Sequence, residues 1–571
     1  MDYRHTKSGR CRKVVPVHRI TLFLLTAGFA LVAGCAAKPA PKADPASHDP
    51  AALTVVAEIA LTRGDCKTAS ESYAEAAQHG AIPLARRASE VALACEHVPA
   101  AWRSAVRWRT LAPTDREASA MYATVAIKLY RMADARSAIG EFAKLQNPQD
   151  SSGLSELAGL LLEQSDAPAV LAAMSGALDP ASLSPDTNAL LAELALDAND
   201  AQRAQRYAQM ALDRDPKQFG AKRVLARAYV IRGDATKAIA TSRDIMREDP
   251  TRGAFELAET FVALDRIEEA HQELERLRGA KASPTEIDRR LALLAYTAGD
   301  FKEAQQRFAE IATQGESSDA AMLFLADIAR RDGDTDAALA GYRRLADSAF
   351  ALEARSKAAS ILLKRSKRSE AMLLLDDYIS DHPDTEFQAR LSEARLLADH
   401  DDAEDGLKLL AAALERHPKH PAIEYDRAVI LERAGRVKES VEVLERLLQE
   451  RPDDPVLMNA LGYTLADHNM DLGRAEGLIH KALLVTPDSP AVLDSLGWVR
   501  YRQGDSKGAV PEFEHAYYLD HDGDIAAHWG EALWASGKHQ DARRVWAAAI
   551  ARSPDAPLLK ATMTRFLKDA S

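Results

Sequence analysis

Between Pro455 and Ala549 the sequence repeats one pattern almost three times, and this repeat constrains the fold more than any other feature. Each copy contains a large apolar residue followed by Gly: Leu461-Gly462, Leu496-Gly497 and Trp529-Gly530. A small residue follows twelve or thirteen places after the Gly, a bulky residue four places later, and an Ala three places beyond that. In chain order these are Ala475, Ile479 and Ala482, then Ala509, Phe513 and Ala516, then Ala542, Trp546 and Ala549. Small residues at such places let two helices approach closely, so the pattern predicts stacked helical hairpins.

The spacing is that of the tetratricopeptide repeat (TPR), a helix-turn-helix unit of about 34 residues. One unit cannot bury its own apolar face, so units must stack. The same register continues backwards along the chain, with Gly-Asp pairs at 64–65 and 233–234 and with Pro216 and Pro250, which lie 34 residues apart. The sequence therefore predicts an all-α TPR solenoid, a right-handed superhelix of about fifteen repeats.

The repeats account for almost the whole chain after the N-terminal leader, and the pattern weakens only between residues 150 and 185. Leu558, Met563 and Phe566 follow the last repeat at helical spacing, as expected of a helix that caps an open solenoid end. The predicted organisation is a leader (1–34), a tether (35–50), N-terminal repeats (51–149), a degenerate repeat (150–185), the main array (186–554) and a capping helix (555–571).

Residues 1–34 have the features of an export leader. Basic residues from Arg4 to Arg19 precede an apolar run, Ile20 to Val32, that is too short to span a membrane. The run ends in Val32-Ala33-Gly34-Cys35, which is similar to a bacterial lipobox, in which the Cys is lipidated and acylated (for example with palmitate). The alternative is an ordinary signal peptide. By resemblance to known lipoproteins, Ala36 in place of Asp favours the outer membrane.

The charge of the chain bears on its partners. The formal charge of −12 falls to −17 when the leader, with six basic residues and one acidic residue, is removed. An acidic body is held at an anionic membrane by acyl chains and not by electrostatics. The pI near 5.8 argues against nucleic acid as a partner. Four prolines between Ala36 and Pro50 indicate an extended tether.

Four cysteines are present, of which Cys11 lies in the leader and Cys35 is the predicted lipidation site. Cys66 and Cys95 remain, in a compartment that favours disulfides. The repeat register places Cys66 at the start of one helix and Cys95 near the end of the next, antiparallel one. We expect the two to pair; the alternative is two small buried thiols.

The sequence carries no recognisable catalytic constellation. His515, His521 and His528 alternate with acidic residues between 520 and 524, which favours a polar turn between repeats over a metal site. We therefore expect no enzymatic activity, no cofactor and no metal.

The concave face is the expected binding surface. By the repeat register, the first and fourth residues after the boundary Gly face the groove, and these places hold Tyr463, Trp498, Tyr501 and Trp534. Aromatic side chains on a concave wall are typical of recognition hot spots. The alternative is that they pack against neighbouring repeats. Asn459 and Asp494 occupy places where some TPR domains clamp a terminal carboxylate, but Trp498 and Tyr463 stand where the other clamp residues would be, so that clamp is not expected.

The lipobox, the TPR array and the segment from Ala460 to Gly504 together resemble proteobacterial outer-membrane TPR lipoproteins of the LbcA family. The resemblance implies a non-enzymatic adaptor that assembles with the periplasmic C-terminal processing serine protease CtpA and presents peptidoglycan hydrolases to it. An alternative is a scaffold of an envelope assembly or polysaccharide-export machine, because many such scaffolds are lipidated TPR arrays.

Overall fold

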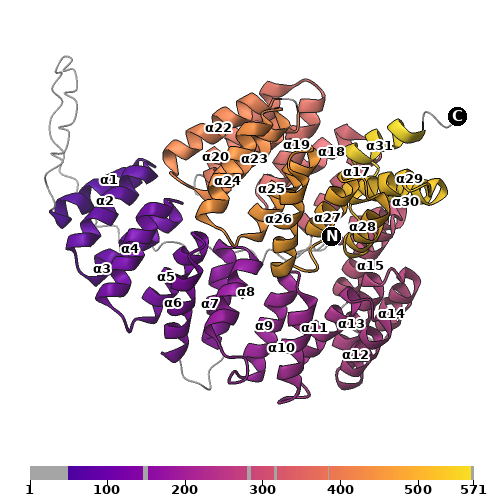
Figure 1. The fold of residues 1–571 in the computed structure, drawn as a ribbon, viewed down its shortest axis with the longest axis horizontal. Helices are drawn as coiled ribbons and strands as arrows, with labels where there is room; N and C mark the ends of the chain where they lie inside the picture. Colours follow the sequence, from indigo (N-terminus) through magenta and orange to yellow (C-terminus); the bar gives the residue numbers. More distant parts are fainter. Residues whose placement is uncertain are drawn as a thin grey trace.

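The computed structural model describes residues 49–145, 152–279, 284–313, 318–382, 385–400 and 402–567. These residues form 31 α-helices and no strand, which confirms the predicted all-α solenoid (Figure 1). The predicted leader, lipidation site and almost all of the tether lie outside the described residues. Across the described part of the chain, none of the helices combines the length and the apolar character needed to cross a membrane.

Thirty of the helices form fifteen consecutive hairpins. The first helices of the hairpins are α1 Pro50–Thr62, α3 Ile82–Ala94, α5 Arg116–Lys128, α7 Ser152–Gln164, α9 Pro185–Asp197, α11 Phe219–Ile231, α13 Pro250–Ala263, α15 Pro284–Ala298, α17 Ser318–Arg331, α19 Ala351–Lys364, α21 Glu386–Ala398, α23 Pro421–Arg433, α25 Pro455–Asp467, α27 Pro490–Arg502 and α29 Gly523–Ala535. The second helices are α2 Cys66–His79, α4 Val98–Leu111, α6 Met132–Lys144, α8 Ala167–Ala177, α10 Ala201–Leu212, α12 Ala235–Glu248, α14 Ile267–Gly279, α16 Phe301–Ile311, α18 Thr335–Arg343, α20 Arg368–Asp381, α22 Ala403–Arg416, α24 Val437–Glu450, α26 Leu472–Val485, α28 Ser506–Leu519 and α30 His539–Arg552. The last helix, α31 Pro557–Leu567, lies within the predicted capping segment.

The turn inside a hairpin is often Gly-Asp, and each residue has a distinct role. The Gly adopts a positive φ (70° at Gly64, 75° at Gly233), which only a residue without Cβ adopts at little cost. The following Asp accepts a hydrogen bond from a backbone N–H in the first turn of the second helix; at Asp65 the donor is the N–H of Thr68, at 3.0 Å. The same pair therefore ends one helix and starts the next.

The motif glycines of the C-terminal repeats, Gly462, Gly497 and Gly530, leave room for a bulky side chain inside each hairpin. A Cβ on Gly462 would lie 2.7 Å from Ile479, and a Cβ on Gly497 would lie 2.8 Å from Phe513. At Gly530 a Cβ would overlap the indole of Trp546, which is fully buried. The Gly and the bulky residue of the motif are thus complementary halves of one contact.

The predicted degenerate repeat is a helical hairpin with altered packing. Helix α8 contacts α6 of the preceding hairpin more closely than it contacts its own partner α7. Regular hairpins, such as α27 with α28, make their closest contacts internally. The loss of the small and bulky motif residues between 150 and 185 explains why α7 and α8 do not close on each other.

The array is long enough for its second superhelical turn to lie against its first. Figure 1 shows the helices around α22–α26 lying beside those around α3–α10, and hydrogen bonds join the two turns. Most of the bonded residues are separated by 282 to 324 positions in the sequence, and the two bonds made by Arg330 and Arg331 span 225 and 220 positions. At about 34 residues per repeat, the larger separations correspond to roughly eight to nine and a half repeats per superhelical turn and the smaller ones to about six and a half.

We call this set of contacts the seam. It joins the loops inside hairpins of the first half of the chain to the loops between hairpins of the second half. Its hydrogen bonds include those from His417 to the carbonyl of Cys95, from His420 to Glu96, from Tyr130 to the carbonyl of Asp453, from Ala201 to Asp488, from Tyr518 to the carbonyl of Val230 and from Arg552 to Asp265.

Candidate functional site

Trp498 is the centre of an aromatic cluster formed by the first helices of the C-terminal repeats. Its ring stacks on His528 of the next first helix, with centroids 4.2 Å apart, and lies 5.3 Å from the ring of Tyr501. Its indole N–H donates to Asp467 of the previous first helix at 3.1 Å. The side chain therefore contacts both neighbouring repeats, and only 7% of Trp498 is exposed.

Asp494 lies one turn before Trp498 and is also buried. Both of its carboxylate oxygens lie 3.0 Å from Nδ1 of His528. Burial alone would lower the pKa of His528, but the Asp494 carboxylate, with Glu531 and Asp524 nearby, outweighs burial and raises it. When His528 is protonated, its imidazolium and the Asp494 carboxylate form a charge-assisted hydrogen bond inside the solenoid.

The other predicted groove residues are partly buried. Tyr463 lies on α25 with its ring 6.4 Å from His528, and burial raises the pKa of its hydroxyl, with a further contribution from Asp467. The Tyr501 hydroxyl donates to Glu531 at 3.0 Å; burial and this carboxylate raise the pKa of Tyr501 to about 12. The amide oxygen of Asn459 is buried and accepts no hydrogen bond from the residues that the structure describes.

Trp534 lies at the end of the array. Its ring is 5.9 Å from Trp546 and 5.8 Å from Phe566 of α31, and it stacks on His539 at 4.3 Å. Helix α31 thus covers the last hairpin with an aromatic ring, as expected of a cap.

These positions correct the expectation that Trp498 and Asp494 are exposed groove residues. The register does place them on the first helices, but the neighbouring first helix brings His528 over the indole and against the carboxylate. Trp498 and Asp494 therefore pack between repeats, whereas the side chains of Tyr463, Tyr501 and Trp534 are partly exposed to solvent. A partner would reach the edges of this cluster and not its centre.

Ion pairs between successive first helices are a feature that the sequence reasoning missed. Lys357 of α19 binds Asp327 of α17 at 2.6 Å, and Arg395 of α21 binds Asp426 of α23 at 2.9 Å. Further along, His468, directly after the end of α25, donates to Glu432 of α23 at 3.1 Å. Acidic and basic residues separated by about one repeat were the signal that could have revealed them.

Among the described residues, Glu432, Asp467 and His468 bring three potential metal ligands within 4.8 Å of one another. Each already has a partner, because His468 donates to Glu432 and Asp467 accepts from Trp498. Of the three histidines weighed as a metal site, His528 binds Asp494, away from the turn, and His521 packs on Tyr517 at 4.9 Å.

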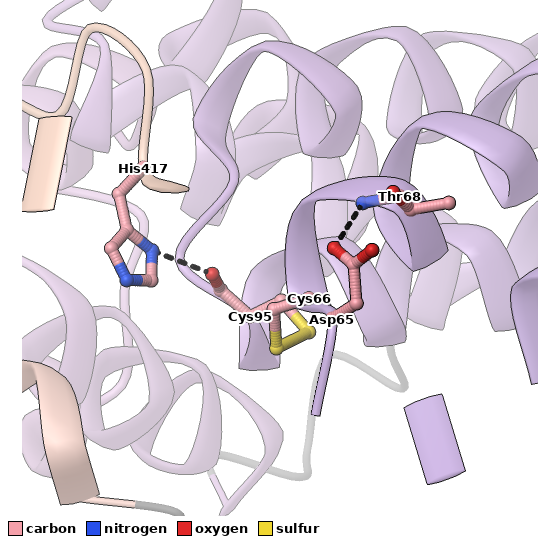
Figure 2. The surroundings of a disulfide bond; sticks show 5 residues. All are labelled: Asp65, Cys66, Thr68, Cys95 and His417. Atoms are coloured by element: carbon pink, nitrogen blue, oxygen red, sulfur yellow. Dashed lines mark hydrogen bonds between the residues drawn. A yellow bond between two sulfur atoms is a disulfide. The ribbon is translucent and has the colours of Figure 1, made fainter. Parts of the chain in front are cut away.

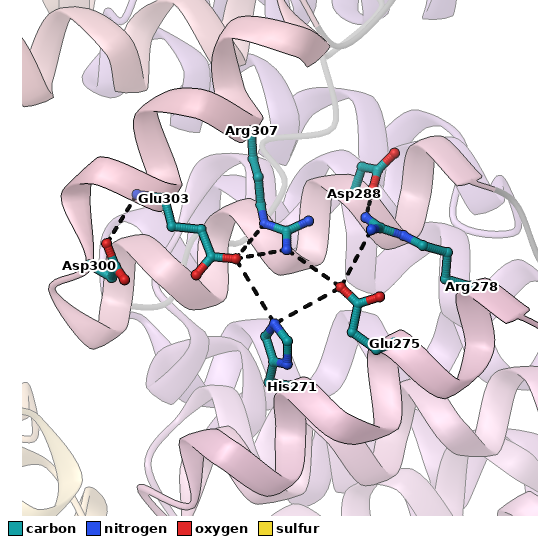
Figure 3. A network of polar contacts seen from close by, with 7 residues as sticks. All are labelled: His271, Glu275, Arg278, Asp288, Asp300, Glu303 and Arg307. Atoms are coloured by element: carbon teal, nitrogen blue, oxygen red, sulfur yellow. Dashed lines mark hydrogen bonds and ion pairs between the residues drawn. The ribbon is translucent and has the colours of Figure 1, made fainter.

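The second helices carry a different polar network on the other side of the hairpins (Figure 3). Arg307 of α16 binds Glu303 of the same helix at 2.7 Å and reaches Glu275 of α14 at 3.4 Å. His271 of α14 lies within 4.0 Å of Glu275 and 3.9 Å of Glu303. These surface pairs join neighbouring hairpins, and each contributes little stability because water screens it.

Cys66 and Cys95 form a disulfide, with their Cα atoms 5.4 Å apart (Figure 2). The bond joins the first residue of α2 to the residue that ends α3. Cys35, the predicted lipidation site, lies outside the described residues.

Comparison with known proteins agrees with this architecture. The tetratricopeptide-repeat family profile matches residues 190–252, 289–351, 391–455 and 529–560. A TPR repeat-containing protein of Pseudomonas aeruginosa is 34% identical over 213 residues, which is 37% of this chain and 36% of the relative. The chain thus spans about a third of the length of the curated relative it matches.

Among solved structures, a thermophilic TPR protein of Thermus thermophilus is 21% identical, with a TM-score of 0.30; the match covers 32% of this chain and 99% of that one. A tetratricopeptide repeat protein of Parabacteroides merdae is 16% identical, with a TM-score of 0.31, and the match covers 44% of this chain and 98% of that one. The profile matches and the fifteen helical hairpins together make this chain an all-α solenoid of tetratricopeptide repeats.

Proposed function

We propose that the protein is a non-enzymatic scaffold that binds other proteins along the inner face of its superhelix. TPR repeats imply a protein-interaction scaffold. The observation that carries the proposal is the inner face of the array, where many successive first helices contact one another directly, as α9 contacts α11 and α25 contacts α27. Such a face offers a long surface of fixed shape to a partner.

The binding region that we favour is the rim of the aromatic cluster in the C-terminal repeats. Tyr463, Tyr501 and Trp534 are half-buried there, and Val456, which is 43% exposed, lies about two helical turns before Tyr463 on the same face of α25. Aromatic groups of this kind bury a large area at a small entropic cost when a partner covers them. The centre of the cluster, at Trp498, supports the rim by holding three first helices together.

The finer form of the proposal is an adaptor at the periplasmic face of the outer membrane, anchored through a lipid on Cys35. In that role the scaffold would assemble with a C-terminal processing serine protease and present peptidoglycan hydrolases to it. The lipobox sequence and the resemblance of the C-terminal repeats support this form. The predicted tether would hold the solenoid away from the membrane.

A photo-crosslinking amino acid at Val456, introduced in living cells, tests the binding face. We expect it to capture the protease, a hydrolase or both. The matched control is the same amino acid at Leu484 of α26, which is 82% exposed but lies on a second helix. Equal capture of the same proteins from both positions, or capture from Leu484 alone, would contradict binding on the inner face.

The anchor has a separate test. We expect Cys35→Ala to leave an unprocessed precursor and to remove the protein from outer-membrane fractions. A Cys35→Ala protein that is still cleaved and still sediments with the outer membrane would contradict lipidation, without bearing on the inner face.

A further inference from the structure

Cys95 takes part in two different links at once. Its sulfur is bonded to Cys66, and its carbonyl oxygen accepts a hydrogen bond from Nδ1 of His417 at 3.0 Å (Figure 2). The first link lies within the first two repeats, while the second is a seam contact that spans 322 residues of sequence. One residue therefore joins the covalent staple of the N-terminal repeats to the superhelical closure.

The next residue, Glu96, continues the same seam contact. It has a positive φ of 52°, which a non-glycine residue keeps only when its surroundings hold it there. Its carboxylate accepts from His420 at 3.0 Å and pairs with Lys128 at 2.6 Å. Burial opposes the charged form of Glu96, but His420 and Lys128 outweigh burial and lower its pKa.

The partner side of this contact is well ordered by its own packing. His420 is 4% exposed, and the ring of Phe387 lies 4.5 Å from it and 5.1 Å from His417. The two histidines thus lie against a fixed aromatic wall. Whether the contact forms depends on where the turn of Cys95 and Glu96 is held.

We propose that the Cys66–Cys95 disulfide is a redox latch of the superhelix. In the oxidised chain the bond holds the turn at Cys95 and Glu96 against His417 and His420, and this first seam contact is closed. In the reduced chain the turn keeps its backbone hydrogen bonds and the Glu96–Lys128 pair but loses its covalent link to α2, and the contact opens. The latch acts on the N-terminal end of the seam, since the bonds at Tyr130, Ala201 and Tyr518 do not involve the turn.

The chemistry requires a dithiol reductant. Cys66 is half-buried and Cys95 is buried, so a thiolate of the reductant attacks the sulfur of Cys66 and Cys95 leaves as a thiolate that takes up a proton. The second thiol of the reductant then attacks the mixed disulfide and frees Cys66. Two electrons and two protons pass to the protein, and the reductant becomes a disulfide.

Hydrogen–deuterium exchange on the full chain, with and without dithiothreitol, tests the latch. Between residues 417 and 423, which touch neither sulfur, every residue except Pro418 and Pro421 has an amide N–H; we expect these amides to exchange at least tenfold faster in the reduced chain. The seam contact between Val230 and Tyr518 should be unchanged, which provides the internal control. Unchanged exchange at 417–423, even with faster exchange around Cys66 and Cys95, would overturn the proposal.

Two variants separate the latch from side effects of the reductant. Cys66→Ser with Cys95→Ser should show the fast exchange at 417–423 without dithiothreitol. His417→Ala keeps the disulfide but removes the bond to the Cys95 carbonyl, so it should show fast exchange at 417–423 when oxidised and little further change on reduction. A His417→Ala chain that still responds tenfold at 417–423 would also contradict the latch.

Discussion

The C-terminal repeats and the seam hold the same helices in different ways. In the C-terminal repeats, rings pack between neighbouring hairpins, as Trp498 does with His528, and within one hairpin, as Trp534 does with Trp546. In the seam, single hydrogen bonds join turns that lie hundreds of residues apart. The first kind of contact is made mainly by apolar rings, whereas the second is made by hydrogen bonds and ion pairs.

The two kinds of contact have different effects: ring packing determines the stability of the repeats, and the seam determines the shape of the superhelix. Ring packing between neighbours contributes several kcal/mol per side chain, and a solenoid is stable through such nearest-neighbour contacts. A typical hydrogen bond contributes about 1 kcal/mol, so the seam adds little to the folding of any one repeat. Because the seam joins two superhelical turns, it instead restricts the pitch. The following predictions test this division, in order of decreasing effect.

The largest effect should come from Trp498→Ala. Removal of a buried indole that contacts the first helices on both sides of its own should lower the free energy of unfolding of the C-terminal repeats by about 3–5 kcal/mol. Denaturant unfolding followed by tryptophan fluorescence measures this loss. The control is Leu484→Ala, which removes an exposed side chain and should change stability by less than about 0.5 kcal/mol. A Trp498→Ala protein that keeps its stability but no longer binds its partner would show instead that Trp498 is part of the binding surface.

Gly530→Ala should have the next largest effect, because the new Cβ would overlap the buried indole of Trp546. Overpacking of this kind costs about 1–3 kcal/mol. The matched control is Gly477→Ala in α26, where a Cβ meets no atom within 4 Å, so the better helix propensity of Ala should stabilise by about 1 kcal/mol. Opposite signs in a thermal unfolding experiment are expected, and equal effects would contradict the role of Gly530.

The seam should respond weakly in stability and clearly in shape. Tyr130→Phe with Tyr518→Phe removes two cross-turn hydrogen bonds and should cost about 1 kcal/mol each at most. Small-angle X-ray scattering should show a larger radius of gyration as the turns separate. Trp498→Ala, measured in the same way under native conditions, should keep the seam closed. An unchanged radius in the double tyrosine variant would mean that the seam does not restrict the pitch.

The smallest effect is a difference in pH response. The pKa of His528 is raised, so its stabilising contribution is full below about pH 6.5 and is lost as the pH rises through the raised value. Burial lowers the pKa of His417, so its contribution is full above about pH 6.5 and is lost as the pH falls through the lowered value. Hydrogen exchange measured at several pH values should show the seam exchanging faster at acid pH and the C-terminal repeats exchanging faster at alkaline pH. The same direction in both regions would contradict the assignment.

The sequence predicted the hairpins well because each depends on residues that lie close together. A Gly, an Ala and a bulky residue within about twenty positions determine how two helices pack, as Gly497 and Phe513 illustrate. The cap followed from helical spacing in the same way, and α31 begins at Pro557. The number of repeats followed once the register was known.

The inner face was harder to predict because burial there depends on the next repeat. The register placed Trp498 on the concave side, but its exposure is decided by His528, thirty residues later. The seam could not be predicted at all from local patterns, because the pitch is the sum of small rotations over roughly nine repeats. An error of a few degrees per repeat would bring different turns together.

The seam has a consequence for how such a chain can change its length. An open solenoid tolerates the gain or loss of one repeat, because each unit contacts only its neighbours. Here, deletion of one repeat between Tyr130 and Asp453 would move every later partner by one unit. Asp488 would then meet a different turn than the one at Asn199 and Ala201, to which it now bonds. The seam contacts therefore constrain the number of repeats in one superhelical turn. A chain that gains or loses a repeat there has to form a different set of contacts between its two turns.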